Sequence, residues 1–87
     1  MTDPMLEIET RIFRIIRQML AKRGVTTQPT ADQSLIDAGL SSLDMVNLML
    51  AVEMEFDLET PQQQITPENF RSVAAIGRLL EALVPAV

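Results

Sequence analysis

Apolar residues near the start of the chain recur every three or four positions, and a proline and a glycine bracket the run. This spacing is the period of an amphipathic α-helix rather than of a half-buried strand. Thr2 or Asp3 can cap the helix, and Pro4 suits its first position. Gly24 suits the position just after the last turn, so we expect the first helix to end there. The apolar stripe consists of Leu6, Ile8, Ile12, Ile15, Ile16, Met19 and Leu20.

Ser41 has the features of an N-cap for a second helix, and Asp44 three residues later completes a capping box with a shorter acid than usual. Asp57 and Pro61 bracket the exit of this helix. Its apolar residues are more numerous than an ordinary surface helix needs. We therefore expect a central helix that touches several neighbours.

Two more N-cap residues predict two further helices in the rest of the chain. Thr66 begins a short helix that runs through Asn69 or Phe70, and Ser72 caps a last helix that Pro85 ends. No internal repeat and no alternating strand pattern is present. The predicted fold is all-α: a small four-helix bundle of three main helices, one short third helix and a long first loop, forming a single domain over residues 1–87.

The long connection over residues 24–41 is unusual for a compact domain, and such loops are often functional. It contains Leu35, Ile36 and Leu40, so we expect it to pack over the core.

The residues that the chain lacks restrict its chemistry. There is no Cys and no His among the 87 residues. Disulfides, thiolate ligands, zinc fingers and every nucleophile paired with histidine are therefore excluded. We expect no bound metal and no enzymatic activity, and a domain that acts through partners.

The net charge of −5 is concentrated in the middle of the chain. Residues 31–70 carry eight acidic side chains and no Lys or Arg, whereas residues 1–30 carry a net charge of +2. A solvated acidic face is one interpretation, and a surface for basic partners is the other. Nucleic acid and anionic membranes are disfavoured as partners.

No apolar run approaches the length of a membrane span, and the N-terminus lacks the pattern of a signal peptide. We expect a cytoplasmic protein without a membrane span, and a monomer.

The segment around Ser42 carries the functional signal. A serine in the first turn of a helix projects from the exposed helix end, beside free N–H groups that tolerate an attached phosphate. Asp37 and Asp44 flank it and could hold a metal brought by an approaching enzyme. Leu40 and Leu43 are expected to anchor the turn in the core. Taken alone, the pair of serines is more typical of helix capping than of a functional site.

This segment resembles the attachment site of acyl and peptidyl (aminoacyl) carrier proteins, a phosphopantetheine-binding family. The resemblance covers nearly the whole chain, because size, helix order and the long first loop also fit. Ser41 departs from the pattern, since it replaces the usual aspartate. The matching residues are Asp37, Gly39, Leu40, Ser42, Leu43 and Asp44, followed by Val46, Leu48, Ala51, Glu53, Glu55, Phe56, Asp57 and Pro61.

The resemblance implies a stand-alone carrier that holds an acyl or aminoacyl group as a thioester on 4′-phosphopantetheine attached to Ser42. A chain without a thiol would borrow one from this arm, whose precursor is coenzyme A. The implied partners are a phosphopantetheinyl transferase, an acyl- or aminoacyl-loading ligase, and downstream synthase or transferase enzymes with basic surfaces.

The second helix departs from that of common fatty-acid carriers. Neutral Met45, Asn47 and Met54 stand where polar or acidic residues are frequent in that group. Packing or incidental exposure is one explanation for the methionines, and a partner surface built on adaptable thioether contacts is the other. The departure favours a specialised pathway over bulk fatty-acid synthesis.

Two sets of residues complete the expected site. Ile65 and Phe70 are candidates to line an acyl path, with plain core contacts as the alternative. The residues expected in partner recognition are Ser41, Leu43, Asp44, Met45, Asn47, Glu53 and Met54.

Arg11, Arg14 and Arg17 are unusual on so acidic a fold. They pair internally with the acids at the end of the second helix or define another partner surface.

The alternative function is a helical adaptor whose acidic and methionine-bearing face binds a basic partner without any prosthetic group. A small hydrolase using Ser42 is much weaker, because no histidine exists to activate the serine.

Overall fold

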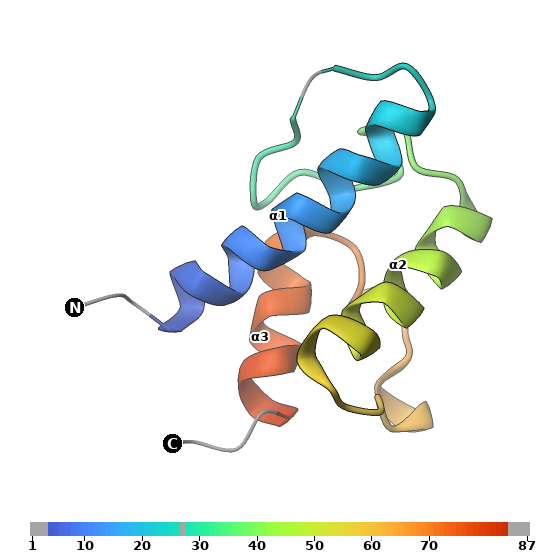
Figure 1. Cartoon of the computed structure of the whole chain (residues 1–87). Helices are drawn as coiled ribbons and strands as arrows, with labels where there is room; N and C mark the ends of the chain where they lie inside the picture. Colours follow the sequence, from blue (N-terminus) through green and yellow to red (C-terminus); the bar gives the residue numbers. More distant parts are fainter. Residues whose placement is uncertain (1–3, 27, 84–87) are drawn as a thin grey trace.

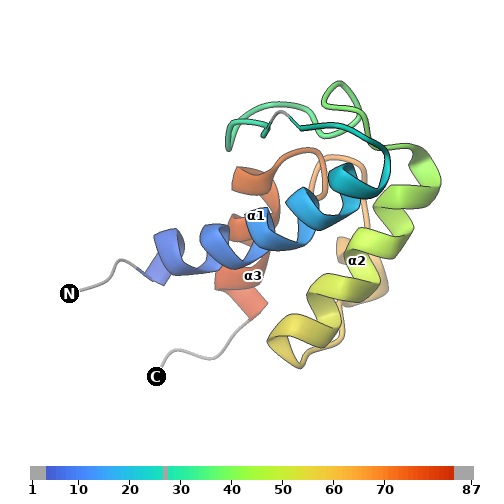
Figure 2. The same ribbon diagram turned by 45° about the horizontal axis from the view of Figure 1, so that its top comes forward.

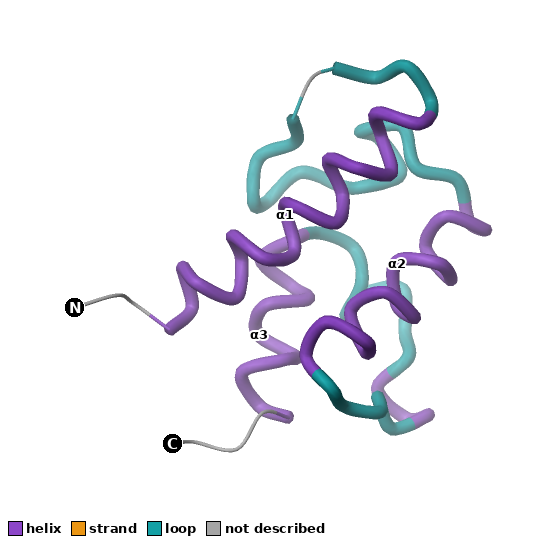
Figure 3. The backbone as a smooth tube through the Cα atoms, viewed as in Figure 1, coloured by secondary structure: helices purple, strands orange, loops and turns teal. Residues whose placement is uncertain are grey.

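The computed structural model describes residues 4–26 and 28–83. This part of the chain forms α1 (Pro4–Lys22), α2 (Ser42–Phe56), a short 3-10 helix η1 (Gln62–Gln64) and α3 (Val73–Leu83) (Figure 1). Within these residues the backbone has helices and loops and no strand (Figure 3), which confirms the all-α prediction. The caps expected at Thr2 or Asp3 and the stop at Pro85 lie outside the described residues.

The central helix is α1. It packs most extensively on α3 and also packs on α2, and Figures 1 and 2 show it crossing in front of α3. Its buried stripe includes Ile12, Ile16 and Leu20. Gly24 adopts a φ of +76°, which confirms the predicted residue after the last turn. The expectation that α2 would be central was wrong, because α1 makes the more extensive helix contacts.

The hydrophobic core forms where α1, α2 and α3 meet the first loop. Most of its members are aliphatic, with one aromatic ring from the turn before α3. The buried members are Ile12, Ile16, Leu20, Leu35, Leu40, Leu48, Val52, Phe70, Val73, Ile76, Leu79 and Leu80.

The long first loop packs on the core as predicted for two of its three apolar residues. Leu35 and Leu40 are buried, and the backbone N–H of Leu35 donates to the carbonyl of Arg71 at 2.9 Å. This bond holds the loop against the segment that leads into α3. The prediction was wrong for Ile36, whose side chain is about half exposed.

The segment before α3 forms a turn rather than the predicted short helix. Its cap is as expected, because Thr66 Oγ1 accepts a hydrogen bond from the Asn69 N–H at 3.2 Å. The Phe70 N–H donates to the Thr66 carbonyl at 3.3 Å, and the helical bonding stops there because the cap of α3 at Ser72 follows at once. The extra helical turn occurs earlier, at Gln62–Gln64.

The start of α3 is capped as predicted, with Ser72 Oγ accepting from the Ala75 N–H at 3.1 Å. Its buried side includes Val73, Ile76 and Leu80. Across residues 4–26 and 28–83, neither α3 nor any other helix combines the length and apolarity needed to cross a membrane.

Candidate functional site

The site begins at the first turn of α2, where Ser41 is the N-cap. Its Oγ accepts from the Asp44 N–H at 3.1 Å, and Asp44 Oδ2 accepts from the Ser41 N–H at 2.8 Å. These reciprocal bonds confirm the predicted capping box. They fix the backbone direction of the two residues between Ser41 and Asp44, which are Ser42 and Leu43.

A residue from the end of α1 reinforces this turn. Arg23 Nε lies 2.6 Å from Asp44 Oδ2, and Arg23 Nη2 donates to Ser41 Oγ at 3.4 Å. The guanidinium, followed by the Ser41 N–H, lowers the pKa of Asp44 to about 2. The first turn of α2 is therefore tied to the end of α1 by an ion pair.

This ion pair changes the interpretation of Asp44. The side chain was expected to face partners or to share a metal with Asp37, yet Asp44 is only 8% exposed and its carboxylate bonds to Ser41 and Arg23. We therefore assign Asp44 a structural role. In the described ranges no three acidic side chains cluster in a way that could hold a metal ion.

Ser42 is the exposed first residue of α2. The chain reaches it through Gly39, whose φ of +120° is a conformation that side-chain-bearing residues rarely adopt. Leu40 is buried and anchors the turn, as expected. Leu43 does not, because it is 69% exposed.

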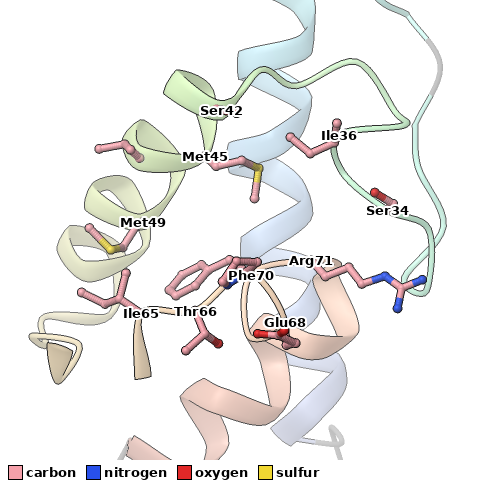
Figure 4. Close-up of a pocket in the computed structure, with 12 residues that line it drawn as sticks. Ser34, Ile36, Ser42, Met45, Met49, Ile65, Thr66, Glu68, Phe70 and Arg71 are labelled. Atoms are coloured by element: carbon pink, nitrogen blue, oxygen red, sulfur yellow. The ribbon is translucent and has the colours of Figure 1, made fainter. Parts of the chain in front are cut away.

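A groove of about 700 Å³ opens beside Ser42, between α2 and the segments that precede α2 and α3 (Figure 4). Its walls are mainly apolar, with a few polar and charged groups. The lining residues are Ser34, Ile36, Ser42, Met45, Val46, Met49, Ile65, Thr66, Pro67, Glu68, Phe70 and Arg71.

The two candidates for an acyl path both line this groove. Phe70 is also buried in the core, so it serves packing as well. Ile65 is partly exposed at the groove. The structure therefore brings Ile65 and Phe70 to the same groove as Ser42, although they lie more than twenty residues away in the sequence.

Four apolar side chains of α2 face solvent. Their spacing of three, four and four residues places them along one side of the helix. The exposed fraction reaches 84% at Met54. This exposed row, and not contact with many neighbours, explains why α2 is so apolar. We call it the α2 stripe; it consists of Leu43, Val46, Leu50 and Met54.

The other recognition candidates divide into exposed and engaged residues. Asn47 is exposed, whereas Met45 is half-buried in the groove. Glu53 Oε2 accepts from the Thr60 N–H at 2.6 Å, so its carboxylate holds the loop that leaves α2. Ser41 and Asp44 serve the cap described above.

One of the three arginines of α1 follows the first of the two expected alternatives, internal pairing. Arg11 pairs internally with the end of α2. Its Nη2 donates to the Glu55 carbonyl at 2.6 Å and lies 3.5 Å from the Glu55 carboxylate. Its guanidinium also stacks on Phe56, 4.2 Å from the ring centroid. Arg14 and Arg17 are exposed.

Sequence reasoning missed three features of the site. Arg23 was not among the expected site residues, and nothing in its position in the sequence indicated a bond to Asp44. Leu50 and Glu68 were not singled out. The excess of apolar residues in the second helix was the available signal for Leu50.

The chain matches the family described as "Phosphopantetheine attachment site" over residues 14–80. It is 43% identical over 74 residues to "Aminoacyl carrier protein 1" of Bradyrhizobium diazoefficiens, covering 85% of this chain and 82% of the relative. It is 42% identical over 80 residues to "Aminoacyl carrier protein 2" of the same organism, covering 92% of this chain and 90% of the relative.

Solved structures are similar over most of the chain. One match is in the crystal structure of Bradyrhizobium japonicum glycine:[carrier protein] ligase complexed with cognate carrier protein and an analogue of glycyl adenylate. The TM-score is 0.73 at 43% identity, covering 86% of this chain and 97% of the other. A second is in the ligase complexed with glycylated carrier protein, with a TM-score of 0.71 at 44% identity, covering 83% and 97%.

Proposed function

Because the chain belongs to the phosphopantetheine attachment-site family, we propose that Ser42 is the residue to which 4′-phosphopantetheine is attached. The observation that carries this proposal is the placement of Ser42. It is exposed at the first position of α2, held by the capping box of Ser41 and Asp44, and it borders a groove.

The surroundings of Ser42 fit a phosphodiester. The first N–H groups of α2 have no partner within the helix, and the positive end of the helix dipole favours an anion there. In the attachment step the Ser42 Oγ–phosphorus bond forms and the pyrophosphate bond of coenzyme A breaks. Adenosine bisphosphate leaves, and the hydroxyl proton passes to the transferase or to water.

The attached group supplies the thiol that the chain lacks. With that thiol the protein is a stand-alone carrier of an acyl or aminoacyl thioester, and the protein itself is not an enzyme. The similarity to aminoacyl carrier proteins favours an amino acid as the cargo, loaded by a separate ligase that forms an aminoacyl adenylate. We place this monomeric carrier in the cytoplasm and in a specialised pathway, with further synthases or transferases as consumers of the cargo.

We assign the docking of the ligase to the α2 stripe. The stripe begins beside Ser42 at Leu43 and ends at Met54, so a ligase seated on it would have the attachment site at one edge of its contact. Exposed apolar side chains in a contiguous row are typical of interaction surfaces, and methionine adapts to different partner shapes. Exposed Asn47 lies on the same helix and belongs to this surface. Asp44 and Glu53 contribute indirectly, because Asp44 holds the start of α2 and Glu53 holds the loop that follows α2.

Intact-mass measurement tests the attachment. The protein is incubated with coenzyme A and a broad-specificity phosphopantetheinyl transferase, and we expect the mass to rise by one phosphopantetheine. Ser42→Ala should show no gain. The matched control, Ser41→Ala, loses the cap hydroxyl but keeps the attachment hydroxyl, so it should still gain the arm.

If the mass gain persists in Ser42→Ala but is lost in Ser41→Ala, the attachment site is Ser41 and not Ser42. A protein that folds and takes no arm would refute the carrier proposal and support the alternative, a helical adaptor without a prosthetic group. For a protein that carries the arm, glycine, ATP and a ligase similar to the crystallised one should add one glycyl group to the thiol.

A further inference from the structure

The groove beside Ser42 has different chemistry at its two ends. Figure 4 shows Ser42 near one end, Met45 and Phe70 along the middle, and Thr66 and Glu68 near the other end. Along α2 the groove extends from Ser42 to Met49, which is about 10 Å at the rise of an α-helix. A chain that starts at Ser42 and follows the groove therefore passes apolar walls and arrives at a carboxylate.

Two charged residues line the groove, Glu68 and Arg71. In Figure 4 the Arg71 side chain extends away from Met45 and Met49 toward the first loop, whereas Glu68 lies beneath Phe70 and close to Thr66. Glu68 is thus the charged group at the far end of the path from Ser42. Glu68 is an exposed residue, so its carboxylate can form an ion pair with a cation at this end of the groove, whereas an alkyl group offers it no such bond.

We propose that the groove receives the arm attached to Ser42 and that the Glu68 carboxylate binds the α-ammonium group of an aminoacyl cargo. The inference rests on the proposed attachment at Ser42. It adds that this carrier itself discriminates for amino acids, with the apolar walls holding the arm and Glu68 recognising the charged end. The groove volume lies within the usual range of about 300–1,000 Å³ for small-ligand sites.

The test compares two cargoes of nearly the same shape. Glycyl and propionyl groups differ mainly by an ammonium in place of a methyl, and both can be installed on Ser42 by transfer from the corresponding coenzyme A thioesters. With isotope-labelled glycine, NMR titration gives the acid dissociation constant of the cargo amine. A nearby carboxylate keeps the amine protonated, so Glu68→Gln should increase this constant about twofold, the size expected for an exposed ion pair.

Glu59→Gln is the matched control, since it removes the same charge from an exposed residue that does not line the groove. It should leave the constant unchanged. A second measurement follows the backbone amide signals of Thr66 and Phe70, which should differ between the glycyl and propionyl forms in the native protein and coincide in Glu68→Gln.

The outcomes separate the two proposals. Loading is checked by mass before each titration, and a protein without an arm on Ser42 overturns the proposed function together with this inference. A fully loaded protein whose amine constant is the same in native, Glu68→Gln and Glu59→Gln forms overturns the inference alone. The same holds if glycyl and propionyl cargoes shift the amides of Thr66 and Phe70 equally.

Discussion

The two long helices, α1 and α2, use their apolar residues differently. In α1 the apolar stripe turns inward except at Leu6, which is 58% exposed, and Ile12, Ile16 and Leu20 are buried between the other helices and the first loop. In α2 only Leu48 and Val52 are fully buried apolar residues, while the α2 stripe of Leu43, Val46, Leu50 and Met54 faces solvent.

The difference separates folding from recognition. The outer side of α1 carries charged and polar residues such as Arg14, Arg17 and Gln18, as expected for a helix whose apolar contacts lie within the chain. The outer side of α2 keeps apolar groups in water, which adds nothing to the stability of the isolated domain. We infer that α1 mainly stabilises the fold and that α2 presents the surface by which partners recognise it.

The largest expected effect compares one leucine from each helix. Leu20→Ala in α1 removes a buried side chain and should lower the free energy of unfolding by about 2–5 kcal/mol. Leu50→Ala in α2 removes a side chain that is 50% exposed and should lower it by less than about 1 kcal/mol. Denaturant titration measures both values, and equal losses would contradict the division between the two helices.

The next effect concerns loading. Met54→Glu places a charge at the most exposed residue of the apolar α2 stripe, so we expect kcat/KM for glycyl transfer by the ligase to fall about 10- to 100-fold. Gln18→Glu adds the same charge to the exposed side of α1 and should leave loading unchanged. If both variants fold and load alike, the α2 stripe is not the docking surface that we propose.

The smallest effect concerns the junction between the helices, where Arg23 at the end of α1 bonds to Asp44 at the start of α2. The pKa of Asp44 is about 2 in the folded chain and about 3.9 when unfolded. Its stabilising contribution is therefore complete above about pH 4 and is lost as the pH falls through about 2. The free energy of unfolding should decline less steeply over this window in Asp44→Asn and in Arg23→Gln than in the native protein. Curves parallel to the native one would show that the ion pair does not stabilise the folded state.

Much of the fold was predictable because its signals are local. The period of the apolar residues, the caps at Ser41, Thr66 and Ser72, and the glycine after the first helix depend on a few neighbouring residues. The attachment motif around Ser42 is local as well, and the family match over residues 14–80 agrees with it. The helix predicted after Thr66 is only a turn, because the caps at Thr66 and Ser72 compete for the same few residues.

The sequence by itself determined the three main helices, the caps that begin α2 and α3, and the serine at the start of α2, since hydrogen bonds within one turn decide these features. Only the tertiary structure decided which apolar residues are buried. Leu48 and Leu50 have the same side chain and nearly the same position in the sequence, yet one is 0% and the other 50% exposed. It also decided that Arg23 reaches Asp44 and that Glu68 shares a groove with Ser42. Contacts between distant residues depend on how the helices pack against one another, and the spacing of residues along the chain does not specify that packing.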